Sequence, residues 1–93
     1  MTLREEHALT IAEIVRDAVA AGDAALARDF EEARFRTQLA AAKADRAGLA
    51  GVAFAAALLL EALGDPGSIP EPGYGEAMNR LAIALDAVGF DPL

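Results

Sequence analysis

A length of 93 residues corresponds to one compact domain, so residues 1–93 are treated as a single domain. The net charge is −7, and residues 47–93 carry one arginine against six acidic side chains. Because phosphate binding requires clustered Lys and Arg, this charge distribution argues against nucleic acid as a partner. The chain contains no cysteine, which excludes disulfides, thiol catalysis and thiolate metal sites.

Alanine dominates the composition, with 24 of the 93 residues. Alanine has the highest intrinsic helix propensity, so the composition predicts a helical protein. Its side chain buries little apolar area, which limits the core that one chain can build and favours a second copy that enlarges it. Arginine outnumbers lysine seven to one, a bias typical of GC-rich bacterial coding sequences.

Neither a membrane span nor a signal peptide is indicated. The longest apolar run, Ala47–Leu60, has 14 residues, fewer than the roughly 18–20 that a membrane-spanning helix needs. Residues 1–6 are charged and lack the apolar segment of a signal peptide. Together with the absence of cysteine, these features predict a cytoplasmic protein that does not interact with membranes.

The first predicted helix starts at Thr2, because Thr2 and Glu5 have the spacing of a capping box. Apolar residues then recur at helical spacing, at Ile11, Ile14, Val15 and Ala18. Gly22 predicts the end of this helix, and Asp23 is a favourable N-cap for the next one. A connection this short predicts an antiparallel helical hairpin.

The second predicted helix begins near Ala24. Its apolar seam has a heptad-like spacing and consists of Leu26, Phe30, Ala33, Thr37, Ala40 and Ala44. We expect ion pairs one turn apart, between Arg28 and Glu32 and between Glu32 and Arg36.

This helix either continues to Leu63 or breaks at Gly48–Gly51. We favour a break or kink there, because each of the two glycines costs about 1 kcal/mol relative to alanine inside a helix. Residues 52–63 are apolar nearly all round, which is typical of a helix at the centre of a bundle or at an oligomer interface. Gly64 then predicts the end of the helix.

Residues 64–75 contain three prolines and four glycines and predict a loop. The last predicted helix covers residues 75–88, and its inner face consists of Met78, Leu81, Leu85 and Val88. Gly89 followed by Phe90 fits a helix C-cap with an apolar residue that folds back. The whole pattern predicts an all-α fold: a small bundle of three to four helices, with an N-terminal hairpin and a C-terminal helix after the Pro/Gly loop.

No catalytic constellation is recognisable. His7, the single histidine, has no identifiable nucleophile or acid beside it, and we expect an exposed or half-buried helix residue. One metal-site hypothesis uses the carboxylates of Glu13, Asp17, Glu31 and Glu32, although a solvated charged face is the simpler interpretation. We therefore predict no catalytic residue, no metal site and no cofactor.

A DNA-binding alternative depends on Ala18 and Gly22, which have the spacing of a helix-turn-helix. Six residues after Gly22 that motif requires an apolar residue, but the sequence has Arg28. The helix that would enter the groove also carries several acidic side chains.

Small residues recur every four positions between Ala40 and Ala55 and allow two helix backbones to approach closely. This pattern fits packing within the chain or a seam between two molecules. Tyr74, in the Pro-rich loop, either forms part of a docking segment or packs over the end of the bundle. The candidate interaction residues are Ala44, Gly48, Gly51, Phe54, Ala55, Leu58, Leu59 and Tyr74.

The sequence therefore favours a small acidic protein-interaction module that is not an enzyme. We expect it to regulate, connect or inhibit a partner protein and to form a homo-oligomer, most simply a homodimer. The alternatives are a carboxylate-based metal-dependent enzyme and, less favoured, a DNA-binding regulator.

Overall fold

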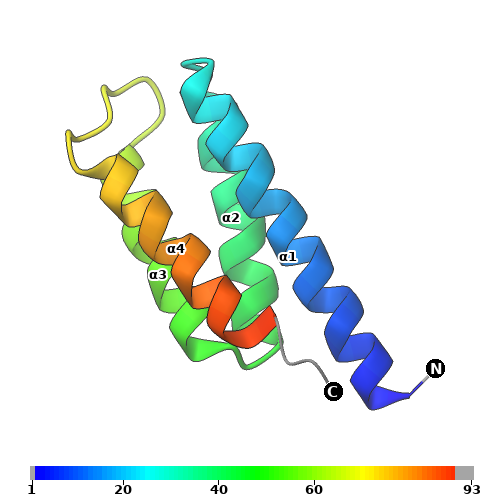
Figure 1. The fold of residues 1–93 in the computed structure, drawn as a ribbon. Helices are drawn as coiled ribbons and strands as arrows, with labels where there is room; N and C mark the ends of the chain where they lie inside the picture. The colour runs from blue at the N-terminus through cyan, green and yellow to red at the C-terminus, as the bar shows by residue number, and fades with distance from the viewer. Residues whose placement is uncertain (1, 90–93) are drawn as a thin grey trace.

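The computed structural model describes residues 2–89 of the chain, which form four α-helices and no β-strand. The helices are α1 (Leu3–Leu26), α2 (Phe30–Arg46), α3 (Ala50–Leu63) and α4 (Tyr74–Gly89). Consecutive helices run in opposite directions, and the first turns of α1 project beyond the other three helices (Figure 1). The predicted all-α bundle, with its N-terminal hairpin and its C-terminal helix after the Pro/Gly loop, is confirmed.

Helix α1 begins as the sequence predicts but ends later. The Thr2 hydroxyl accepts a hydrogen bond from the Glu5 amide at 3.1 Å and caps the helix. The predicted end at Gly22 is wrong, because α1 continues through Gly22 to Leu26. A Cβ at position 22 would lie 3.5 Å from the Met78 sulfur, so Gly22 occupies a point where α1 and α4 pack closely.

The turn between α1 and α2 is a Schellman motif that residue types alone do not reveal. Arg28 adopts the left-handed conformation, with φ of 61°, where glycine is usual. The Asp29 amide donates to the Ala24 carbonyl at 2.8 Å, and the Arg28 amide donates to the Ala25 carbonyl at 3.0 Å. Asp29, not Asp23, caps α2 by accepting from the Glu32 amide. The expected Arg28–Glu32 pair within one helix is therefore wrong, since Arg28 lies in the turn.

The chain repeats this turn between α2 and α3, and there the predicted break is confirmed. Gly48 has φ of 75°, and the Leu49 amide donates to the Ala44 carbonyl at 2.9 Å. Gly64, with φ of 76°, ends α3 as expected. These two glycines lie where a left-handed backbone is needed, whereas Gly22 does not.

Small and branched apolar residues form the core. Each helix packs mainly against two neighbours in the cyclic order α1–α2–α3–α4, and within the described residues the backbones of the diagonal pairs do not come into contact. The largest fully buried apolar side chains are Ile14, Val52, Leu59, Leu63 and Leu81. Several fully buried alanines allow the helices to approach closely, and these are Ala33, Ala40, Ala44 and Ala56.

The predicted inner faces are mostly correct. In α4, Leu81 and Leu85 are buried and Met78 and Val88 are half-buried, as expected. Leu26 is the exception in the second seam: it belongs to α1 and is 87% exposed. The predicted cap that involves Phe90 lies outside the described residues. Across residues 2–89, no helix is both long enough and apolar enough to span a membrane.

Candidate interaction surfaces

Arg34 ties the end of α3 and the following loop to α2. Its side chain is only 5% exposed, although arginine is rarely buried. Nε and Nη2 donate to the Leu63 carbonyl at 3.2 and 2.8 Å, and further bonds reach the carbonyls of Gly64 and Ser68. Nη1 contacts Glu31 Oε1 at 2.6 Å, and Glu31 also accepts from the Gly67 amide. The guanidinium thus satisfies carbonyls that a helix end would otherwise leave without donors.

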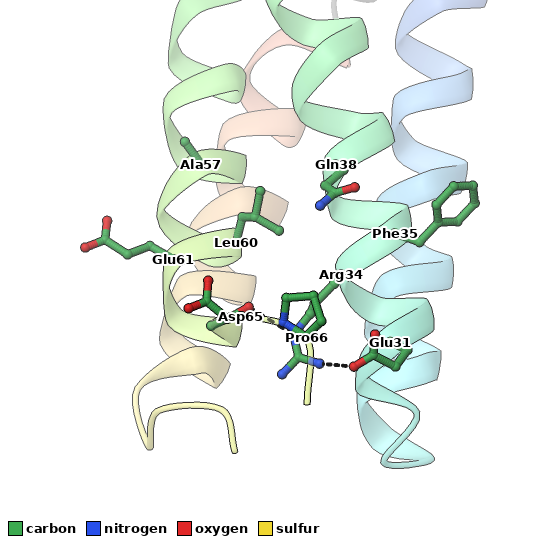
Figure 2. Close-up of a pocket in the computed structure, with 10 residues that line it drawn as sticks. Glu31, Arg34, Phe35, Gln38, Ala57, Leu60, Glu61, Asp65 and Pro66 are labelled. Atoms are coloured by element: carbon green, nitrogen blue, oxygen red, sulfur yellow. Dashed lines mark hydrogen bonds and ion pairs between the residues drawn. The ribbon is translucent and has the colours of Figure 1, made fainter. Parts of the chain in front are cut away.

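A groove of about 730 Å³ lies between α2 and α3, next to this anchor. Figure 2 shows Leu60 of α3 and Gln38 of α2 directed toward the space between the two helices, with Pro66 at the loop end. Phe35 and Glu61 point outward on opposite sides of the groove in the same view. The α2–α3 groove therefore has apolar and polar walls and an open rim.

The α2–α3 groove is negatively charged. Three carboxylates line it, those of Glu31, Glu61 and Asp65, and Arg34 contributes the single positive charge. Glu31 and the loop carbonyls already bind that guanidinium. Glu61 and Asp65 form no ion pair with any other described residue, so their charges face solvent.

A second, apolar groove of about 260 Å³ lies between α1 and α4. Its walls are aliphatic apart from Asp86, and its lining consists of Val15, Ala18, Val19, Met78, Leu81, Ala82, Leu85 and Asp86. Helices α1 and α4 have the least extensive contact of the four neighbouring pairs, which leaves this side of the bundle partly open.

Exposed apolar side chains continue from this groove over the α1 surface. Val19 is 57% exposed and lies in a helical stripe with Ala8, Ala12 and Val15, all of which are exposed. On α4, Ile83 is 60% exposed beside Ala82. We call the groove, this stripe and Ile83 the α1–α4 face.

The residues singled out from the sequence do not form one surface. Ala44, Ala55 and Leu59 are buried among the helices and contribute to packing within the chain. Leu58 is half-buried. Only Gly48, Gly51 and Phe54 are exposed, and Phe54 is the most prominent at 66%.

Tyr74 packs against the bundle at the loop end. It is half-buried, and its ring meets that of Phe30 edge to face, with centroids 5.8 Å apart. The contact favours the packing interpretation of the Pro-rich loop over the docking one. Ile69, in the loop that precedes α4, is 92% exposed.

The carboxylates of the metal-site hypothesis pair with cations instead of gathering. Asp17, with its side chain 5% exposed, binds Lys43 at 2.8 Å and lies 3.5 Å from Arg36. Glu13 lies 3.7 Å from the same Lys43, and the predicted Glu32–Arg36 pair is present at 3.6 Å. Within residues 2–89, no three acidic or histidine side chains form a group that suits a metal ion.

The helix-turn-helix alternative loses its structural basis, because the predicted turn at Gly22 lies inside α1. His7 is exposed on the first turns of α1, as expected.

Arg34 and Val19 are the informative residues that sequence analysis missed. Arg34 follows Phe30 by four positions and precedes Thr37 by three, so it shares the inward edge of the helix; this spacing was the available signal for a buried arginine. Val19 extends the spacing of Ala8, Ala12 and Val15, which marks a second apolar stripe on α1.

Comparison with known proteins adds no relative: no protein-family model, no curated protein and no solved structure matches the chain.

Proposed function

We propose that the chain is a small acidic protein-interaction module that regulates or connects partner proteins as a homodimer, with the α1–α4 face joining the two copies. The observation that carries this proposal is the exposure of Val19 in the lining of an apolar groove, with the exposed Ile83 next in sequence to the lining residue Ala82. Isolated exposed apolar residues are common, but a group of them around a groove is typical of interaction sites.

The size of the face suits a dimer. A long side of the 42 × 20 × 20 Å molecule has a projected area of roughly 800 Å², so one side of the bundle is large enough to hold a standard stable interface, in which each partner buries about 800 Å². Burial of this face would also enlarge a core in which alanine is frequent.

Two exposed charged residues of α1 are placed so that they could pair across a two-fold symmetric dimer interface. Arg16 and Asp23 are exposed and lie seven residues apart, or about two helical turns, on the side of α1 that carries Val19. A two-fold axis that crosses α1 next to Val19 places Arg16 of each copy opposite Asp23 of the other. An interface of this kind uses the same patch on both copies, as most homodimers do.

Light scattering over micromolar to hundred-micromolar concentrations tests the dimer. We expect the wild-type protein to have twice the 9.6 kDa mass of one chain. Val19→Glu buries a charge in the interface and should give a monomer, whereas Ile69→Glu, a matched change on the loop, should remain dimeric. Circular dichroism checks that both variants fold. A wild-type monomer at every concentration, or equal effects of the two variants, contradicts the proposal.

A further inference from the structure

The α2–α3 groove lies on the side of the bundle opposite the α1–α4 face. This follows from the cyclic packing order, in which α2 and α3 pack together on one side of the bundle and α1 and α4 pack together on the other. A copy bound to the α1–α4 face therefore leaves the α2–α3 groove accessible.

Apolar side chains of α3 line this groove, and a further exposed one lies beyond it. The exposed Ala57 and the half-buried Leu60 line the groove, and Phe54, which is 66% exposed, precedes Ala57 by three residues just outside this lining. On the α2 side, Phe35 is 51% exposed. Phe54 and Leu60 are six residues apart, or about 9 Å along the axis of α3. A bound helix would cover this distance with somewhat less than two turns.

The negative charge at the α2–α3 groove favours a ligand with positively charged side chains. Glu61 and Asp65 lie at the end of α3, whose last turn contains no basic residue. The negative end of the helix dipole adds to their potential. Arg34 is 5% exposed and is held by Glu31 and the loop carbonyls, so little of its positive charge reaches the rim. Across residues 47–93, the sequence contains only one basic residue, Arg80.

We infer that the α2–α3 groove binds an amphipathic helix of a partner protein, with its apolar side on Phe54, Ala57 and Leu60 and its Lys or Arg side chains at Glu61 and Asp65. Two adjacent helices offer a channel in which a third helix packs with anchors at i, i+3 or i+4, and i+7. Complementary charge steers association and sets the orientation of such a helix. The inference rests on the proposed function as an interaction module and adds the chemistry of the partner.

A synthetic Leu/Lys peptide with amphipathic helical order is the probe, and titration calorimetry measures its binding. A peptide of identical composition in scrambled order, and a Leu/Glu peptide in the amphipathic order, are the ligand controls. We expect binding of the ordered Leu/Lys peptide alone, weakened by added salt because exposed charges are screened.

Two substitutions locate the site. Glu61→Lys should weaken binding about fivefold to tenfold, because a rim attraction becomes a repulsion. Phe54→Ser, which removes an exposed anchor, should also weaken binding.

Unchanged binding by Glu61→Lys, equal binding of the scrambled peptide, or no binding of the ordered peptide overturns the inference. Val19→Glu separates this result from the homodimer. A monomeric Val19→Glu protein that binds the peptide supports both surfaces, while an intact dimer without peptide binding refutes the α2–α3 site alone. Peptide binding by a wild-type monomer refutes the dimer alone.

Discussion

Replacement of Arg34 by methionine tests whether one buried guanidinium holds α3 and its loop to α2. Methionine keeps an unbranched apolar stem of similar reach but removes every donor. The Leu63 carbonyl would lose two hydrogen bonds, and those of Gly64 and Ser68 would lose one each. We therefore expect a large decrease in the free energy of unfolding.

The magnitude follows from which groups water can reach after the change. Leu63 is fully buried, so its unsatisfied carbonyl costs about 1–3 kcal/mol. Ser68 is exposed and the Glu31 side chain is 65% exposed, so water replaces most of their lost interaction. We estimate a total loss of about 3 kcal/mol, against a stability of about 5–14 kcal/mol for a chain of this length.

Urea denaturation at fixed protein concentration, followed by circular dichroism, measures this loss. With an m value of about 1.5 kcal/mol/M, the midpoint should fall by about 2 M. Arg34→Lys keeps the charge but not the fork of donors, and should lose about half as much. Arg80→Met changes an exposed arginine of α4 and should stay within about 0.5 kcal/mol of wild type. If Arg34→Met behaved like Arg80→Met, the proposed anchoring role would be wrong.

Two further stability predictions concern the packing of α1 on α2 and the α2–α3 turn. Asp17→Ala should lower the free energy of unfolding, measured by urea denaturation, by about 1–2 kcal/mol. Lys43 and Arg36 lose a buried partner, but their side chains are about one-third exposed and water replaces part of the interaction. A loss below about 0.3 kcal/mol would show that this ion-pair network contributes little. Gly48→Ala should lower the free energy of unfolding by about 1 kcal/mol, because φ at this position is 75°. Gly51→Ala should raise it by about 0.5 kcal/mol, because Gly51 lies inside α3 with open space around it. Thermal melting checks both signs, and equal shifts for the two variants would contradict the assignment of the turn.

The candidate interaction surfaces are harder to predict than the fold, because the sequence does not show which apolar residues face solvent. Phe54 is one of the candidate interaction residues from the sequence, and its side chain is 66% exposed. Ala55 and Leu59 of the same helix have the same apolar character but face the core. In a helix that is apolar nearly all round, periodicity cannot tell the inner side from the outer side, since only the positions of α2 and α4 decide which residues are covered.

Local chemistry in the sequence by itself determined the helical class, the Thr2 cap, the break at Gly48 and the end of α3 at Gly64, because propensity and left-handed glycines act within a few residues. Tertiary packing decided the rest. Gly22 stays helical where α1 meets α4, and Arg28 accepts a left-handed backbone so that α2 can begin at its Asp29 cap. The partners of Arg34 lie about 30 residues away in the chain, so only the folded bundle brings them together and forms the groove beside them.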